Sequence, residues 1–160
     1  MTSIKRLEFT GFKTVGQLRD DISCIPNEGG IYLIIGPKVS TKKFLPNGTG
    51  GFFKGKDPNV SIEVLHNNWI ENCIVLYIGK AGGKNSSATL KSRLRQYLDF
   101  GNGKPVGHYG GRYIWQLSNC KELLVAWKIL RTIDPRKEEQ NMIKDFRNYY
   151  GKLPFANLKL

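Results

Sequence analysis

Two tyrosine–glycine triplets carry the clearest chemical signal in this sequence. Gly30-Ile31-Tyr32 lies in one apolar run, and Tyr77-Ile78-Gly79 lies in another. Continuous apolar runs of this length are typical of buried strands, and a buried phenol needs a polar partner. Two such phenols on neighbouring strands, beside glycine backbone that carries no side chain, would form a small polar pocket into which a phosphate fits.

A predicted helix places a cation next to that pocket. Leu90, Leu94 and Leu98 recur every fourth residue and predict the buried stripe of a helix over 88–100, capped by Ser86-Ser87 and ended by Gly101. Arg93 and Tyr97 share one face of this helix, at the boundary of core and solvent. The planar guanidinium of Arg93 can hold a phosphate. The alternative is a surface arginine that packs its stem on the protein.

A carboxylate is predicted to point inward from the last helix, 135–150. Its apolar residues are Met142, Ile143, Phe146, Tyr149 and Tyr150. At 100° per residue, Glu139 lies about 20° from their mean direction and Glu138 about 80°. An inward carboxylate needs a divalent metal, or an arginine or lysine, to offset its desolvation. After this helix, Asn157 belongs to a tail that we expect to fold back, where its side chain orients the site or caps a turn.

The pattern of elements predicts an α+β fold, with a small central antiparallel or mixed sheet of three to four strands flanked by helices. We expect one domain over 1–160, with a motif core over 29–157, a helical N-terminal extension over 1–28 and a basic loop insertion over 36–59. The predicted helices are 15–23, 88–100 and 135–150, and the predicted strands of the sheet are 30–35, 73–78, 113–117 and 123–130, with 61–65 as a candidate for a further short strand.

Composition favours a polyanionic partner. The chain has 25 Lys and Arg against 13 Asp and Glu, a net charge of +12, which favours nucleic acid over acidic membranes. No apolar run reaches the length of a membrane span and no secretory leader is visible, so we expect a cytoplasmic protein that does not enter a membrane. The three cysteines are far apart in the sequence and are expected to be reduced thiols, two of them in the core.

Basic residues gather around the middle helix. The candidates for DNA contact are Lys84, Lys91, Arg95, Lys104 and Arg112. A second group of lysines, which includes Lys38, lies with Phe44, Phe52 and Phe53 in the 36–59 loop. That loop would wrap a duplex, enter a groove to wedge a base step, or have no role. His108 lies in a glycine-rich segment and is expected to be a solvated loop residue.

Taken together, these elements resemble the GIY-YIG nuclease family. The resemblance rests on Gly30-Ile31-Tyr32, on 77–81, on the helix around Arg93, on 139–143 and on 154–157, and it spans 30–157 with the elements in the family's order. It implies the GIY-YIG fold with a three-stranded antiparallel sheet. It also implies hydrolysis of DNA phosphodiester bonds with a divalent metal. The family often has histidine where this chain has Tyr97, which puts in doubt a mechanism that relies on an imidazole base at that position.

The resemblance implies roles for particular residues. Glu139 would bind one Mg²⁺ or Mn²⁺, Arg93 would contact a phosphate oxygen, and Tyr32 would orient or deprotonate the attacking water. Lys80 is the alternative base, or the cation that lowers the pKa of Tyr32. Tyr77 and Tyr97 would hydrogen-bond to water or phosphate, and Gly30, Gly79 and Asn157 would support the site.

The sequence leaves the function open among three hypotheses. The first is an endonuclease on double-stranded DNA of restriction type. The second is a nuclease of the same chemistry in repair or in mobile-element cutting. The third is a nucleic-acid-binding module that has lost catalysis, against which the four residues Tyr32, Tyr77, Arg93 and Glu139 argue. Cleavage of both strands would require a homodimer or sequential nicking.

Overall fold

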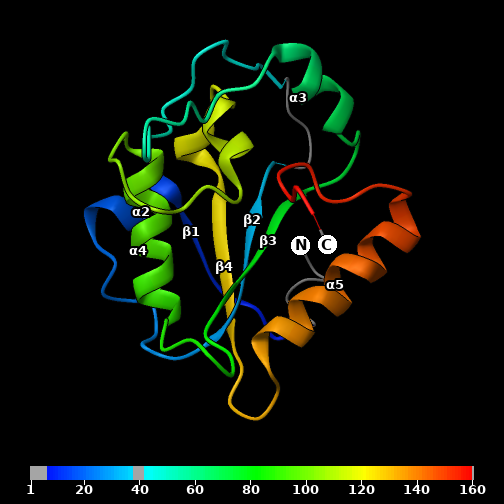
Figure 1. The fold of residues 1–160 in the computed structure, drawn as a ribbon. Helices are drawn as coiled ribbons and strands as arrows, with labels where there is room; N and C mark the ends of the chain where they lie inside the picture. Colours follow the sequence, from blue (N-terminus) through cyan, green and yellow to red (C-terminus); the bar gives the residue numbers. More distant parts are fainter. Residues whose placement is uncertain (1–6, 38–41, 160) are drawn as a thin grey trace.

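An antiparallel sheet forms the centre of the fold (Figure 1). The computed structural model describes residues 7–37 and 42–159, and this part of the chain contains a four-stranded sheet in the order β1-β4-β2-β3. All three strand pairings are antiparallel. The strands are β1 (Thr10–Thr14), β2 (Gly30–Ile35), β3 (Val75–Ala81) and β4 (Leu124–Ile129). The predicted α+β class is confirmed, and the sheet is antiparallel rather than mixed.

Helices cover both faces of the sheet. In Figure 1, α4 (Leu90–Gly101) and α5 (Pro135–Tyr150) lie on opposite sides of it. The α4 side carries the larger core, which includes Tyr32, Ile34 and Trp115. The α5 side carries a smaller core around Leu33 and Ile143. Two shorter helices, α2 (Val15–Asp20) and α3 (Ile62–Asn68), and two 3₁₀ turns, η1 (Arg112–Gln116) and η2 (Cys120–Glu122), complete the described elements.

β2 and β3, the strands that carry the two tyrosine–glycine triplets, were located from the sequence because most of their residues are buried. Every residue of β2 is buried, so its apolar run has no alternation and reads clearly as a core strand. The prediction for β3 began two residues too early, because Cys73 and Ile74 precede the strand, and it stopped before Gly79, Lys80 and Ala81. Glycine and lysine are poor strand formers, and pairing with β2 overrides that preference.

Capping chemistry fixes the helix ends. Asp134 caps α5 by accepting a hydrogen bond from Arg136 N, and Gly151 ends it in the left-handed conformation, as expected. For α4 the expected caps Ser86 and Ser87 are wrong. The cap is Thr89, which exchanges hydrogen bonds with Ser92 in a reciprocal capping box. The leucine stripe of α4 is buried as predicted.

Two predicted strands are helical turns. Residues 61–65 belong to α3, because Ser61 accepts a hydrogen bond from Val64 N and so caps a helix. Residues 113–117 mostly form η1, which lies within the core on the α4 side. Its backbone is paired locally, through bonds such as Leu117 N to Ile114 O, and its residues are buried on all sides. β-Branched and aromatic composition alone cannot distinguish such a segment from a strand.

The N-terminal extension also differs from the expectation of a purely helical segment. Residues 10–14 form β1 on the edge of the sheet, and only 15–20 are helical, shorter than the predicted 15–23. β1 is mostly half-exposed and contains glycine and two threonines, so its apolar signal is weak. Residues 1–6 lie outside the described part of the chain.

The 36–59 loop is anchored by its aromatic residues and by one buried amide. Phe44 is buried among Trp69 and Phe155, whereas Phe52 is 54% exposed. The Gln116 side chain donates to Leu45 O and Val60 O at 3.0 and 2.9 Å. The alternatives for Phe52 and Phe53 stay open, and Lys38 lies outside the described residues.

The cysteine prediction is confirmed: Cys73 and Cys120 are buried free thiols and Cys24 is an exposed one. In the described ranges no helix has the length and apolar character needed to cross a bilayer.

We expect Gly79→Ala to destabilise the fold. A Cβ atom at Gly79 would lie 2.3 Å from Cζ of Tyr32, so the ring or the strand must move, which costs about 1–3 kcal/mol. Urea denaturation measures this loss. Gly16→Ala in α2 is the control, since its Cβ would meet Lys121 O at an ordinary 3.5 Å and alanine favours helix. Equal stability of the two variants would contradict the packing argument.

Candidate active site

The sequence-predicted residues converge on one cavity. A cavity of about 180 Å³ is lined by Tyr32 and Tyr77 from the sheet, Arg93 from α4 and Glu139 from α5. Lys80, at the end of β3, is a fifth charged or phenolic member, and the remaining lining comes from Ala81, Gly82, Ser86 and Ala88. Tyr32, Tyr77, Arg93 and Glu139 were predicted to meet around a single gap, and this convergence is confirmed.

At both triplet glycines a neighbouring group lies where a side chain would be. Tyr32 pairs with Gly79 across β2 and β3, and its ring occupies the space where a Gly79 side chain would be. At Gly30 a Cβ atom would lie 2.0 Å from Lys128 O of β4. Gly79 therefore leaves room for the Tyr32 ring, and Gly30 leaves room for the backbone of β4.

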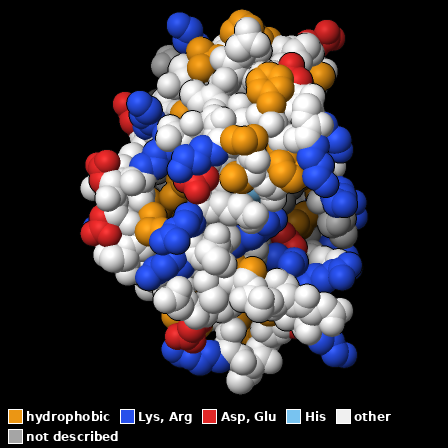
Figure 2. Space-filling view, turned by 60° about the vertical axis from the view of Figure 1, so that its left-hand side comes forward, with side chains coloured by type: hydrophobic (Ala, Val, Ile, Leu, Met, Phe, Trp, Pro, Cys, Tyr) orange, Lys and Arg blue, Asp and Glu red, His pale blue; other side chains and the backbone are white. Residues whose placement is uncertain are grey.

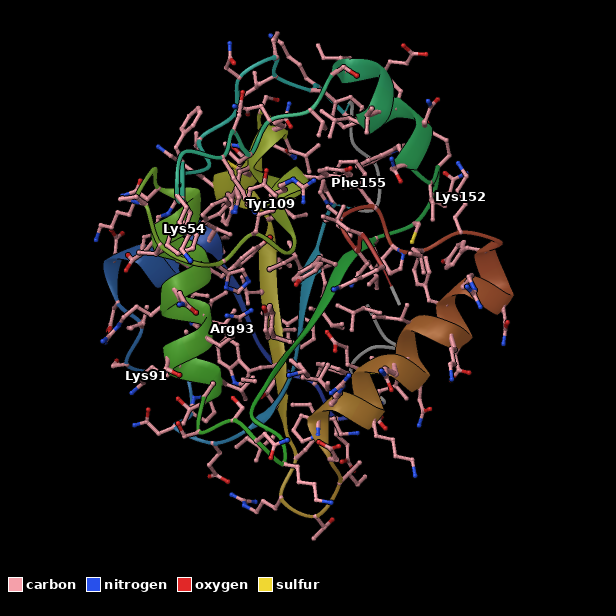
Figure 3. The ribbon with its side chains drawn as sticks, in the orientation of Figure 1. Lys54, Lys91, Arg93, Tyr109, Lys152 and Phe155 are labelled. Carbon is pink, nitrogen blue, oxygen red and sulfur yellow. The ribbon has the colours of Figure 1, made fainter. Side chains whose placement is uncertain are left out.

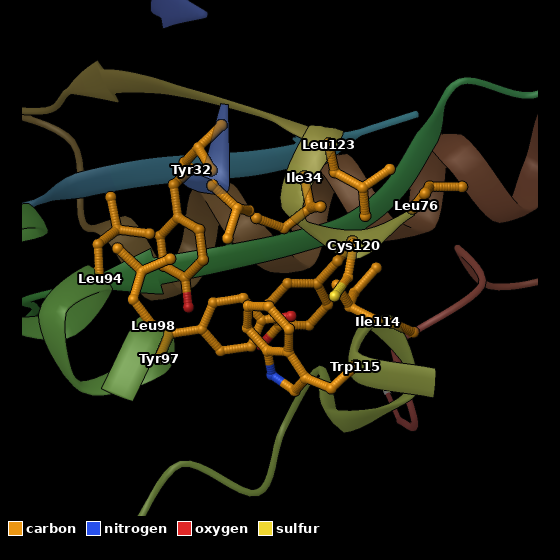
Figure 4. Close-up of a cluster of buried hydrophobic side chains, with 14 of the residues drawn as sticks. Tyr32, Ile34, Leu76, Leu94, Tyr97, Leu98, Ile114, Trp115, Cys120 and Leu123 are labelled. Carbon is orange, nitrogen blue, oxygen red and sulfur yellow. The ribbon is translucent and has the colours of Figure 1, made fainter. Parts of the chain in front are cut away.

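The three tyrosines form one aromatic cluster. Tyr77 stacks on Tyr97 with ring centroids 5.7 Å apart, and Tyr32 meets Tyr77 edge-on at 6.0 Å. Figure 4 shows Tyr97 projecting from α4 into the core beside Trp115, with Tyr32 reaching down from β2. The Tyr97 hydroxyl donates to Gly111 O at 2.8 Å, and Tyr97 does not line the cavity. Its hydroxyl therefore holds the 101–111 loop in place.

Arg93 points from α4 toward the strands (Figure 3). Its Nη1 donates to the Gln96 side chain at 2.8 Å, which fixes one edge of the guanidinium. The part-buried guanidinium lines the cavity and is not in an ion pair with any described carboxylate. The interpretation of Arg93 as a stem-packing surface residue is therefore wrong, and its free donors are available to an anion.

Glu139 lines the cavity, where its carboxylate is partly desolvated. Burial raises the pKa of Glu139, opposed by the nearby charges of Lys80, Arg93 and Arg136. Among the described residues Glu139 forms no ion pair and no hydrogen bond, so a bound arginine or lysine does not account for its position. The inward direction of Glu139 was predicted from five apolar residues of this helix. Two of them face solvent, since Tyr149 is 82% exposed and Tyr150 is also exposed, whereas Ile143 and Phe146 are buried.

Asn157 holds the cavity strand from its outer edge. Its side chain accepts from Ile78 N at 3.0 Å and donates to Ile78 O at 2.9 Å. This amide takes the place of a further strand along β3, between Tyr77 and Gly79. Of the two roles considered for Asn157, the structure favours orientation of the site over capping of a turn.

His108 is the residue that sequence reasoning misjudged. It is not solvated: its exposed fraction is 1%, and its Nε2 lies 3.4 Å from the Tyr32 hydroxyl. Burial, and secondarily the charge of Arg93, lower the pKa of His108 to about 3. The surrounding sequence 107–111 is glycine-rich and polar, typical of an exposed loop. Only the two aromatic neighbours, Tyr109 and Tyr113, were a signal that this segment packs against the protein.

The raised pKa of Tyr32 disfavours ionisation of its phenol. Burial is the largest cause that raises its pKa well above the ordinary value, Tyr77 adds to the effect, and the charge of Arg93 opposes it. Burial likewise raises the pKa of Tyr77 to about 12. The lowering of the Tyr32 pKa that a base role requires is not supplied by Arg93, because desolvation outweighs the charge of the arginine.

Two further hollows adjoin the cavity along the start of α4. One of about 470 Å³ includes Lys84 and Arg131 and shares Gly82 and Ala88 with the cavity. The other, of about 350 Å³, shares Ala88 and Arg93 and includes Arg95. The three hollows share Ala88, and we refer to them together as the groove. At its larger end Arg131 is paired with Glu28 at 2.8 Å, which leaves Lys84 as the unpaired cation there among the described residues, and Arg95 lies at the other end. Figure 2 shows Lys and Arg side chains spread over the face on this side of the molecule.

The basic residues proposed for DNA contact are placed differently from one another. Lys84 and Arg95 are exposed, Lys91 is half-buried, and Lys104 pairs with Asp99 at 3.3 Å. Arg112 is stacked on the ring of Tyr109, 4.2 Å from its centroid. Lys84 and Arg95 therefore remain the best placed of the five for contact along the groove.

Comparisons with protein-family models, with curated proteins and with solved structures give no match for this chain. What the site does is therefore argued from its residues and their geometry.

We expect Glu139→Gln to stabilise the metal-free protein at neutral pH. The folded pKa of Glu139 is raised from 4.5, so the ionised carboxylate destabilises the fold as pH rises through that pKa. The gain should vanish below about pH 4, where the unfolded chain is also protonated. Thermal unfolding across pH in EDTA measures it. Glu138→Gln, one position away, should give no gain; the same pH-dependent gain in both variants would show that Glu139 is not specially desolvated.

Proposed function

We propose that this protein is a metal-dependent DNA endonuclease of the GIY-YIG type. The observation that supports this most is the convergence of Tyr32, Tyr77, Arg93 and Glu139 around one phosphate-sized cavity. Two phenols, a guanidinium and an unpaired carboxylate are the groups needed to hold a phosphodiester, a water and a divalent ion together. The three strands β4-β2-β3 also agree with the three-stranded sheet that the resemblance implies.

The residues present suit one hard divalent ion such as Mg²⁺ or Mn²⁺. The described residues contain no group of three or more His, Cys, Asp and Glu arranged to hold a metal, and Glu139 is the only carboxylate that lines the cavity. Mg²⁺ commonly uses one or two carboxylates together with waters and substrate phosphate. The unpaired oxygens of Glu139 fit such a role. When bound, the ion would neutralise phosphate charge and stabilise the leaving oxygen.

The protein side chains position the reacting groups. Arg93 offers donors to a non-bridging phosphate oxygen, where its charge stabilises the developing negative charge. Tyr32, which lines the cavity, would orient the attacking water, and Lys80 is the alternative proton acceptor at the same site. Tyr77 hydrogen-bonds to water or phosphate, and its alignment depends on the Asn157 contacts with Ile78.

The groove supports a polymeric substrate. It continues past the cavity in two directions, with Lys84 and Arg131 at one end and Arg95 at the other. A net charge of +12 favours a polyanion. Phosphates on either side of the scissile one would follow this groove, whereas a single small phosphate ester would need only the central cavity.

Replacing Arg93 should separate catalysis from binding. Arg93→Ala should lower the single-turnover cleavage rate of plasmid DNA by at least about 100-fold, because a transition-state donor is lost. Arg95→Ala, two residues further along the same helix, should cleave at nearly the native rate once DNA is saturating. Equal loss in both variants would contradict the assigned role of Arg93.

Glu139→Ala should abolish cleavage and retain DNA binding, since it removes the proposed ion and leaves the basic surface. Nicking assays with Mg²⁺, Mn²⁺ or EDTA, paired with a gel-shift assay, measure both. Native cleavage by this variant in Mg²⁺ would reject the metal assignment.

DNA binding by the unaltered protein without metal-dependent cleavage would instead favour the catalytically inactive binding module. Discrete fragments, a smear or structure-dependent nicks would separate restriction, non-specific and repair activities.

The basic ends of the groove should contribute to affinity. The double variant Lys84→Ala and Arg95→Ala should bind duplex DNA more weakly and reduce the salt slope by about 2, one for each lost phosphate contact. Fluorescence anisotropy over a salt series measures this. Lys152→Ala, which Figure 3 shows on the side of the molecule away from α4, is the control. A double variant with the control's affinity would place the DNA elsewhere.

A further inference from the structure

His108 places an imidazole beside Tyr32, a cavity residue, and it lies outside the motifs that resemble the nuclease family. It belongs to the 101–111 segment, which follows α4, and its ring lies between two of the site tyrosines. Its centroid is 4.6 Å from that of Tyr97, and its Nε2 is 3.4 Å from the Tyr32 hydroxyl. The family's usual histidine position is Tyr97 in this chain. The imidazole therefore packs directly on the residue that replaces it.

Hydrogen bonds on both sides of His108 hold this segment in place. On one side of His108, Tyr109 donates its hydroxyl to Asp57 O at 2.6 Å. Further along, Gly111 O accepts from Tyr97 at 2.8 Å. His108 N itself donates to Val106 O at 2.9 Å. These bonds fix the backbone on both sides of the ring, so its position next to Tyr32 does not depend on a solvated loop.

A histidine at this buried position lowers the stability of the fold relative to an apolar side chain. Its Nδ1 is buried and has no hydrogen-bond partner among the described residues, and an unpaired buried polar nitrogen costs about 1–3 kcal/mol. An apolar side chain would fill the same space without that cost. A buried, unpaired histidine aimed at a site phenol therefore points to a role in proton chemistry.

Resting on the proposed function, we propose that His108 accepts the phenolic proton of Tyr32 as Tyr32 takes a proton from the attacking water. The water oxygen forms its bond to phosphorus while the bond from phosphorus to the leaving oxygen breaks. One proton moves from water to the Tyr32 oxygen and another from that oxygen to His108 Nε2. The leaving oxygen departs with the electron pair of the broken bond and takes a proton from solvent, so the relay ends with an imidazolium, a neutral phenol and a cleaved diester. His108 acts through Tyr32 and is a positioning residue in this sense.

The relay resolves the difficulty with Tyr32 as a base. A free phenolate is disfavoured in this buried site, and the relay never forms one, because the phenol loses and gains a proton together. The charge of Arg93 suppresses protonation of His108 when the cavity holds no anion. A phosphate bound to Arg93 offsets that charge and makes the imidazole a better acceptor. The groups that bear on His108 protonation are Tyr32 of β2, Tyr77 of β3, and Arg93 and Tyr97 of α4.

His108→Gln tests the relay directly. A glutamine amide can hydrogen-bond to Tyr32 and fill most of the space, but it cannot accept a proton. We expect single-turnover cleavage to fall about 100-fold or more at neutral pH. The native rate should be nearly flat between about pH 7 and about pH 9, since a buried His108 stays neutral there. The variant's rate should rise about tenfold per pH unit, because hydroxide must replace the lost acceptor.

A second variant separates chemistry from folding. His108→Ala leaves a gap beside Tyr32, and added imidazole should restore part of its cleavage while DNA affinity and melting temperature stay constant. A native rate in His108→Gln, or a uniform loss with an unchanged pH profile and no imidazole rescue, would overturn the relay. If the unaltered protein failed to cleave DNA in Mg²⁺ or Mn²⁺, the proposed function itself would fail. That result differs from the two that overturn the relay, because in both of those the unaltered protein cleaves DNA.

Discussion

The contact between the Tyr32 ring and the backbone of Gly79 is the constraint on which the site depends. Because Gly79 has no side chain, the Tyr32 ring of β2 can lie against the backbone of β3 and line the cavity. Tyr77 then meets it edge-on, and α4 packs over both rings through Tyr97. A larger residue at position 79 would displace the phenol from Arg93 and His108 together.

The cavity and the adjoining His108 combine groups that would be unfavourable in an ordinary core. Glu139 is desolvated and unpaired, Arg93 has free donors, and His108 leaves a nitrogen without a partner. Each of these costs folding free energy, and strained or unsatisfied groups of this kind gather at functional sites. A phosphodiester with one divalent ion would pair with two of these groups at once: anion to arginine and cation to carboxylate. The arrangement is therefore better explained by a substrate than by stability.

Sequence reasoning located the site because its signals are local. Glycine beside tyrosine in a buried run, the arginine on a leucine-striped helix and the inward position of Glu139 follow from strand and helix periodicity alone. Residues 61–65 and 113–117 were misjudged because capping by Ser61 and burial of η1 on all sides override strand propensity. His108 was missed because its burial depends on long-range contacts, such as Tyr109 with Asp57, which no local pattern reports.

The most direct test of this account is the position of a bound metal. Crystals of the protein grown with a short DNA duplex and soaked in Mn²⁺ would locate the ion by its anomalous scattering. The account predicts one peak within about 2.0–2.3 Å of a Glu139 carboxylate oxygen, with a DNA phosphate between it and the Arg93 guanidinium. Mn²⁺ bound elsewhere while Glu139 remains without a ligand, or a phosphate backbone that avoids the cavity, would contradict it.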